Sequence, residues 1–251
     1  IEHPDVARML MTMKALTQGA RAICYSCAEA LDMARVTEGG EAKAWSERAS
    51  LITPIAKAFA TDIGMEVASL GVQVHGGMGF IEETGAARLL RDARIAPIYE
   101  GTNGIQAIDL VMRKLPLSGG ATVAALIADF TADADAMRAS NAPAFEGVAD
   151  RLDGAIADLE SSTSYMQSAL ADGRQTDALS GATPYLRLFG LTATTAMLAR
   201  GALADMDAPE AAGRAALVRF AAANLAPETK GLAASATAGA ACLADASAAL
   251  A

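Results

Sequence analysis

The most suggestive polar residue of the chain is Glu100, which lies in the non-helical run 98–103 directly before a predicted helix. Pro97 keeps this run from being helical, and Thr102 is a good N-cap for the helix that follows. The free N–H groups at such a helix start favour a negative ligand or a developing oxyanion. Taken alone, however, this carboxylate is better explained as a capping or surface glutamate.

A glycine-rich corner, His75-Gly76-Gly77-Met78-Gly79-Phe80, precedes this run. Glycines let a ligand approach the backbone closely and offer free N–H groups, which suits a pyrophosphate. A tight connection between two helices uses the same residues. The cluster alone favours that simpler interpretation.

Three motifs together are far more specific than either feature alone. Residues 73–80 (QVHGGMGF), 90–94 (LRDAR) and 98–106 (IYEGTNGIQ) have the order and spacing found in the acyl-CoA dehydrogenase family. Over about residues 1–116 the chain resembles that family's C-terminal helical domain, entered after its first helix. The Ala-rich part, 121–251, resembles the extension of a subgroup that includes 3-methylmercaptopropionyl-CoA dehydrogenases. The resemblance implies these two regions as domains.

The resemblance implies a flavin-dependent enzyme that converts an acyl-CoA thioester to a trans-2-enoyl-CoA and passes electrons to an electron-transfer flavoprotein. Glu100 matches the family's catalytic base, and Tyr99 and Gly101 match positions beside the substrate. A base of this kind needs a carboxylate in a dry, apolar site, because desolvation raises its pKa toward neutrality.

The resemblance also implies FAD as the cofactor. The residues that match its contacts are Gln73, Val74, His75, Gly76, Gly77, Thr102 and Gly104. Gly104 replaces a polar residue common in the family, so only its backbone could contribute. In the family the FAD at the glycine corner belongs mainly to the neighbouring subunit, which implies a homo-oligomer, a dimer or a tetramer. Arg91 and Asp92 match the family's Arg-Asp pair, which we interpret as a structural ion pair supporting the loop and not as catalytic residues.

The elements that position these residues are expected to be helices throughout. Apolar residues at steps of three and four predict one long helix from residue 3 to the Gly39-Gly40 pair and another from about Ala44 to Val74. Pro54 predicts a kink or an opened turn in the second helix. Shorter helices, a linker at 116–120 and four or five Ala-rich helices follow. The expected fold is all-α, an up-and-down helical bundle followed by a second helical bundle.

Net charge and composition argue against several classes of partner and site. The chain has 29 acidic and 20 basic residues, a net charge of −9, so its surface repels nucleic acid. The two distant histidines make a shared metal site improbable. Cys24 and Cys27 lie on the apolar stripe of the first helix and are expected to be buried small hydrophobic residues. No run of about 18 apolar residues predicts a membrane span, and we expect a cytoplasmic location.

Two other hypotheses deserve comparison. A non-catalytic helical interaction module could use the same scaffold, but the presence of Glu100 favours an enzyme. A di-metal bundle needs Glu-x-x-His pairs on two helices, which the sequence lacks. Because the chain begins without an initiator Met and the motifs of the flavin-ring pocket are missing, we expect a fragment without a complete active site of its own.

Overall fold

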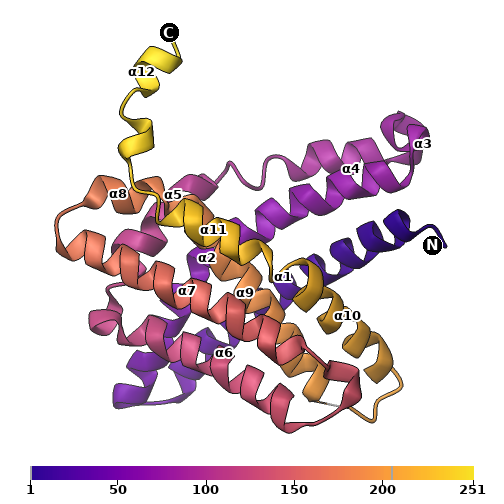
Figure 1. Ribbon diagram of the computed structural model, residues 1–251, viewed down its shortest axis with the longest axis horizontal. Coiled ribbons are helices and arrows are strands. Elements are labelled where there is room, and N and C mark those ends of the chain that lie inside the picture. Colours follow the sequence, from indigo (N-terminus) through magenta and orange to yellow (C-terminus); the bar gives the residue numbers. More distant parts are fainter. Residues whose placement is uncertain (1, 205) are drawn as a thin grey trace.

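The computed structural model describes residues 2–204 and 206–251, and in these ranges the chain consists of helices and turns without a strand (Figure 1). The all-α fold expected from the sequence is confirmed. Two long helices that pack along each other, α1 (Pro4–Val36) and α2 (Gly39–Val74), form the N-terminal part. They are the scaffold on which the later motifs rest.

The ends of these helices differ from the prediction. Helix α1 ends at Val36, because its C-cap Thr37 has an extended backbone (φ −103°, ψ 170°), and the Thr37 N–H and hydroxyl both donate to the carbonyl of Met33. Gly39 and Gly40 therefore begin α2 rather than ending α1, and Gly39 adopts a φ of +60° that lets the chain reverse. The second helix remains continuous through the buried Pro54.

Short elements connect α2 to the second half of the chain. They are α3 (Gly77–Phe80), a 3-10 turn (Glu82–Thr84), α4 (Ala86–Ala93), α5 (Asn103–Asp109), a π-helical turn (Leu110–Lys114) and a 3-10 turn (Leu117–Gly120). The second half contains α6 (Ala121–Ala139), α7 (Val148–Ala171), α8 (Gln175–Ser180), α9 (Ala182–Leu203), α10 (Ala211–Asn224), α11 (Glu228–Ala236) and α12 (Ala246–Ala249).

Helix α9 is the centre of the molecule (Figure 1). It packs against α1 and α2 from the first half and against α6, α7, α10 and α11 from the second. One hydrophobic core therefore contains residues of both predicted domains. The domain boundary at 116–121 remains a prediction.

Two glycines bring α9 close to its neighbours. A Cβ on Gly190 would lie 2.2 Å from Cδ2 of Phe59 on α2, and a Cβ on Gly19 of α1 would lie 2.2 Å from Cγ2 of Thr194. Real carbon contacts are about 3.5–4.0 Å, so no larger residue fits at either crossing.

Ion pairs add specific ties around this core. Arg200 of α9 makes two hydrogen bonds of 2.9 Å to the buried Asp133 of α6. Burial raises the pKa of Asp133, against the opposing effect of the Arg200 guanidinium. Arg187 of α9 reaches Glu66 of α2 at 3.1 Å.

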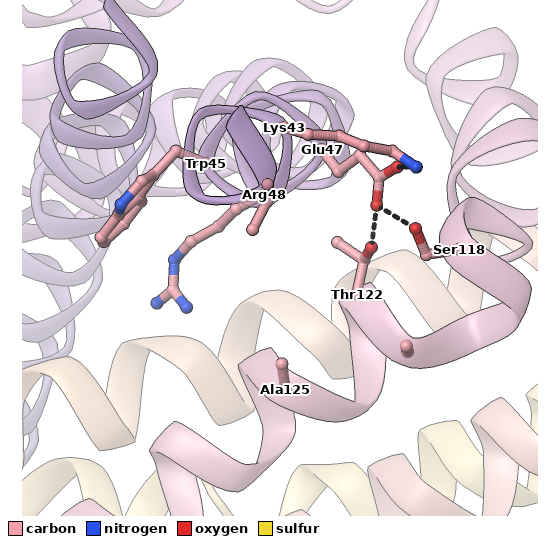
Figure 2. A pocket seen from close by; sticks show the side chains of 10 residues that line it. Lys43, Trp45, Glu47, Arg48, Ser118, Thr122 and Ala125 are labelled. Carbon is pink, nitrogen blue, oxygen red and sulfur yellow. Dashed lines mark hydrogen bonds and ion pairs between the residues drawn. The ribbon is translucent and has the colours of Figure 1, made fainter. Parts of the chain in front are cut away.

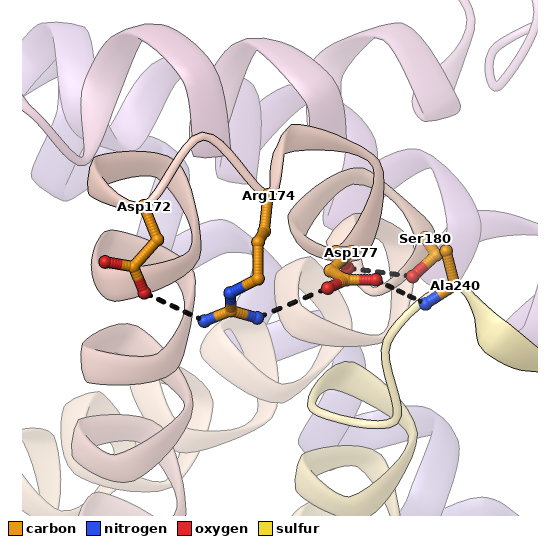
Figure 3. Close-up of polar contacts among 5 residues, drawn as sticks. All are labelled: Asp172, Arg174, Asp177, Ser180 and Ala240. Carbon is orange, nitrogen blue, oxygen red and sulfur yellow. Dashed lines mark hydrogen bonds and ion pairs between the residues drawn. The ribbon is translucent and has the colours of Figure 1, made fainter.

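The C-terminal segment is tied to the body at α8. The carboxylate of Asp177 accepts a 2.9 Å hydrogen bond from the backbone N–H of Ala240 (Figure 3). Arg174 joins the same carboxylate to Asp172, with 3.3 Å contacts to each. Beyond this tie, α12 projects away from the helices of the body (Figure 1).

The cysteines differ from the prediction in part. Cys24 is exposed and Cys27 is half-buried, so the expectation that both are buried is wrong for Cys24. Helix α1 packs against α2, α9 and α10, and Cys24 lies on a part of its apolar stripe that these helices leave exposed. Among residues 2–204 and 206–251 no three His, Cys, Asp or Glu side chains lie close enough together to hold a metal ion.

No single described helix is long and apolar enough to cross a membrane. The segments Asn103–Lys114 and Leu117–Ala139 meet that test only when they are taken together, and they are bent by 83° relative to each other.

Candidate functional site

The turn that carries Glu100 lies between α4 and α5. Pro97 is buried, and its carbonyl accepts a 3.0 Å hydrogen bond from the backbone N–H of Asn103, which closes the turn. Glu100 has a φ of +53° and Gly101 a φ of +87°. A glutamate in this left-handed region costs on the order of 1–3 kcal/mol unless its surroundings hold it there. Residues held in this sparsely populated region are concentrated at active sites and switch regions of proteins.

Two polar side chains fix the turn to α2. Lys57 donates from Nζ to the carbonyl of Gly101 and to Oδ1 of Asn103, both at 2.8 Å. Asn103 donates from Nδ2 to the carbonyl of Ala58 at 3.0 Å and to Oγ1 of Thr61 at 2.9 Å. The backbone on the C-terminal side of Glu100 is therefore bound to two successive turns of α2.

Helix α5 begins as the sequence predicts. Thr102 is the N-cap, and its hydroxyl accepts from the backbone N–H of Ile105 at 3.4 Å. A Cβ on Gly101 would lie 3.2 Å from Nε2 of Gln106, so this glycine is needed both for its positive φ and for space. Tyr99, Glu100, Gly101 and Thr102 thus lie in one turn, and Gly104 lies in the first turn of α5 directly after it.

The surroundings of Glu100 differ from the dry site expected of a base. Glu100 is exposed, and so are the apolar side chains nearest to it along the chain, Ile98, Tyr99 and Ile105. The described residues do not by themselves enclose the carboxylate. These three exposed apolar side chains, close to Glu100 along the chain, form an apolar rim of the turn.

The glycine corner lies at the end of α2. His75 is the C-cap, and its Nδ1 lies 2.7 Å from the carbonyl of Gly71, which fixes the imidazole. Gly76 has a φ of +60°, and Gly76 and Gly77 are exposed, with open space where a Cβ would be. Gly79 has another role, because a Cβ there would lie 2.2 Å from the carbonyl oxygen of Val72. Its absence of a side chain serves helix packing rather than a ligand.

The two groups of predicted site residues are not brought together. The corner that contains Gln73, Val74, His75, Gly76 and Gly77 lies at the end of α2. The Glu100 turn is fixed beside Lys57, 18 residues earlier, and at 1.5 Å per residue the separation is about 27 Å along the helix. Figure 1 shows the corner near α3 and the other group near α5, at separate places along α2.

The expected ion pair between Arg91 and Asp92 is wrong in its partner. Arg91 binds Glu82 at 2.8 Å instead. Successive residues on a helix point in different directions, so Arg91 and Asp92 cannot face each other. Arg91 still braces the turn between α3 and α4, as expected of a structural residue.

Sequence reasoning missed Lys57 and assigned no role to Asn103. Lys57 lies in a segment with strong apolar periodicity, and Asn103 lies three residues after the more conspicuous carboxylate of Glu100. The available signal was a lysine in the apolar middle of a helical stretch, between Ile55 and Phe59 in the sequence.

A pocket of about 400 Å³ lies elsewhere, between the first turns of α2 and α6 (Figure 2). Glu47 accepts 2.7 Å hydrogen bonds from the hydroxyls of Ser118 and Thr122 there, and these bonds lower the pKa of its carboxyl. Trp45 and Arg48 lie on the opposite side of the pocket. None of the predicted site residues lines it.

Comparisons with protein families match almost the whole chain. The family described as "Acyl-CoA dehydrogenase, C-terminal domain" matches residues 1–115. The family described as "Acetyl-CoA dehydrogenase C-terminal like" matches residues 123–247.

Curated relatives carry similar names. A 3-methylmercaptopropionyl-CoA dehydrogenase of Ruegeria pomeroyi is 44% identical over 207 residues, which is 81% of this chain and 34% of that protein. A broad-specificity linear acyl-CoA dehydrogenase of Mycobacterium tuberculosis is 36% identical over 124 residues, 49% of this chain and 20% of that protein. The chain thus spans about a third or less of the length of these relatives.

Solved structures share the fold. An acyl-CoA dehydrogenase of Bacillus anthracis complexed with FAD aligns with a TM-score of 0.69 at 17% identity, over 92% of this chain and 41% of that one. The Caenorhabditis elegans protein ACDH-11 in complex with C11-CoA aligns with a TM-score of 0.68 at 20% identity, over 90% of this chain and 37% of that one.

Proposed function

The chain belongs to the acyl-CoA dehydrogenase family, and from this we propose that it is the C-terminal part of a flavin-dependent acyl-CoA dehydrogenase. The proposed reaction removes a proton from the α-carbon and a hydride from the β-carbon of an acyl-CoA thioester, giving a trans-2-enoyl-CoA. The observation that carries the proposal is the position of Glu100, a carboxylate on a left-handed residue in a turn fixed to α2.

Glu100 is proposed to accept the α-proton. Gly101 has no side chain, so the thioester can lie against the backbone next to the base, and Tyr99 lines the same turn. A general base of this kind must be desolvated when it acts. The exposed apolar rim formed by Ile98 and Ile105 supports closure by substrate and by parts of the protein outside this chain.

FAD is the proposed cofactor, and when bound it supplies the acceptor for the hydride. The exposed backbone of Gly76 and Gly77 fits a pyrophosphate, because no side chain keeps the ligand away. His75, fixed by the carbonyl of Gly71, borders the same corner. Thr102 and Gly104 offer a second set of contacts beside the base.

The separation of the two sets supports a proposal about assembly. They lie about 27 Å apart along α2, so they suit the flavins of two different subunits better than a single flavin. We place this chain in a homo-oligomer, a dimer or a tetramer. An electron-transfer flavoprotein is the proposed electron acceptor, and the cytoplasm is the proposed location.

The test is Glu100→Gln in the full-length protein, which keeps the shape of the side chain and removes the base. Flavin reduction by acyl-CoA should fall by about a hundredfold to ten-thousandfold while the flavin content stays at the parental level. Glu83→Gln, at an exposed glutamate in the turn after α3, is the matched control and should reduce its flavin at the parental rate. If Glu100→Gln does so as well, the scaffold is a non-catalytic interaction module or uses a different base.

A further inference from the structure

Lys57 differs from the other lysines in what it binds. Its Nζ donates to two neutral oxygens, the carbonyl of Gly101 and Oδ1 of Asn103. Lys43 and Lys114, by contrast, reach carboxylates at 3.7 Å and 3.4 Å. No ion pair of Lys57 occurs among the residues that the structure describes. The half-buried ammonium of Lys57 therefore binds a backbone carbonyl and a side-chain amide oxygen in place of a carboxylate.

The backbone that Lys57 holds is the Gly101–Thr102 peptide, one peptide beyond the one that directly follows Glu100. The Gly101 carbonyl reaches Lys57 in a backbone conformation in which Glu100 and Gly101 both have a positive φ. An L-residue leaves that region readily when nothing holds it. The bond from Lys57 therefore stabilises the conformation that sets the direction of the Glu100 side chain.

Asn103 completes the same arrangement from the other side. It receives the second bond from Lys57 and donates to the carbonyl of Ala58, one residue further along α2. Its backbone N–H also closes the turn onto Pro97. Removing Lys57 leaves Asn103 attached to α2 but frees the Gly101 carbonyl, so the effect of the lysine is separable from folding of the turn.

We propose that Lys57 is a positioning residue for the base, fixing the Gly101–Thr102 peptide on α2 so that the Glu100 carboxylate meets the α-carbon of the substrate. This inference rests on the proposed function of Glu100. A misplacement on the order of 1 Å at a reacting group can cost about a hundredfold in rate. Lys57 acts through the Gly101 carbonyl and has no direct contact with the reacting atoms.

The test uses the full-length flavin-loaded protein and stopped-flow reduction of its flavin by butyryl-CoA and longer acyl-CoA thioesters. Lys57→Met keeps the aliphatic stem and removes both hydrogen bonds. The limiting rate of flavin reduction should fall about tenfold to a hundredfold, whereas the acyl-CoA concentration at half the limiting rate changes less than threefold. Flavin content should stay at the parental level.

Two further variants separate positioning from a loss of stability. Lys114→Met removes another half-buried lysine and should leave the limiting rate unchanged. Lys57→Arg keeps a cationic donor and should recover at least a third of the lost activity on a logarithmic scale. If Lys57→Met folds poorly, the rate of flavin reduction per bound flavin in Lys57→Arg decides instead. A Lys57→Arg rate as low as that of Glu100→Gln contradicts positioning by a cationic donor.

The outcomes distinguish the two proposals. A parental limiting rate in Lys57→Met together with a strongly reduced rate in Glu100→Gln overturns the inference about Lys57 and leaves the base in place. A parental rate in Glu100→Gln overturns the proposed function itself. A rate loss in Lys57→Met that merely follows lost flavin, with a parental rate per flavin, also overturns positioning.

Discussion

The contact between α9 and α2 at Gly190 gives a prediction whose sign opposes helix propensity. Gly190→Ala places a methyl group in the middle of a helix, where alanine is favoured over glycine by about 1 kcal/mol. The same methyl carbon would lie 2.2 Å from Cδ2 and 2.4 Å from Cγ of Phe59. A normal carbon contact of about 3.5 Å is longer by more than 1 Å, so the ring or one helix must move.

The size of the loss follows from the surroundings of that ring. Phe59 is 1% exposed, and α1 and α9 both pack against α2, so the ring cannot rotate into solvent. Overpacking of such a site costs about 1–3 kcal/mol and occasionally more. With about 3 kcal/mol of strain against about 1 kcal/mol of gained propensity, we expect Gly190→Ala to lower the free energy of unfolding by about 2 kcal/mol.

A matched control lies on the same helix. Nothing lies within 4 Å of a Cβ built on Gly201, so Gly201→Ala should raise the free energy of unfolding by about 0.5–1 kcal/mol. Urea unfolding of the 251-residue chain, followed by far-UV circular dichroism, measures both variants. Phe59→Leu in the Gly190→Ala background should recover part of the loss. If Gly190→Ala is as stable as Gly201→Ala, the two helices do not cross as closely as the structure has them.

Two further predictions concern polar ties. Arg200→Met leaves the buried Asp133 without its two hydrogen bonds and should lower the free energy of urea unfolding at pH 7 by about 1–2 kcal/mol. This range is at the low end for hydrogen bonds to a charged group because the Arg200 side chain is half exposed. Since burial raises the pKa of Asp133, this cost should shrink as the pH falls and the carboxyl takes up a proton; an equal cost at pH 4 would contradict the argument. Asp177→Asn should speed hydrogen exchange at Ala240 without moving the unfolding midpoint. The Ala240 N–H and Arg174 lower the pKa of Asp177, so in the parent this tie is present at neutral pH and is lost only as the pH falls below the ordinary range of about 3.9, which the same exchange measurement checks.

Apolar periodicity and helix-breaking residues predicted the helical elements well, because prolines and glycines in the sequence mark where helices end. Pro116, Pro143, Gly173 and Pro227, residue types that break helices, all lie between the α-helices of the structure. The predictions were wrong for the end of α1 and for the burial of Cys24. Thr37 ended α1 before the glycine pair could, and the exposed position of Cys24 follows from which helices cover α1, which periodicity does not specify.

The candidate site was predictable as a set of motifs but not as a geometry. Sequence order brought Tyr99, Glu100 and Gly101 together because they are neighbours in one turn. The separation from the glycine corner depends on the length of α2 and on where the turn returns to it. That return is set by Lys57, which lies 44 residues from the carbonyl it binds. No local pattern contains such a pairing.

The exposed state of Glu100 and the strain at its backbone are connected. The proposed base has to be reached and covered by substrate. Its direction has to be fixed while its side chain stays open to substrate at the surface, where packing offers little to fix it. Hydrogen bonds to backbone from a neighbouring helix can do so, since they fix the peptide while leaving the side chain uncovered. The pairing of an exposed Glu100 with a peptide bound to Lys57 fits that requirement, and burial of the same carboxylate within this chain would not.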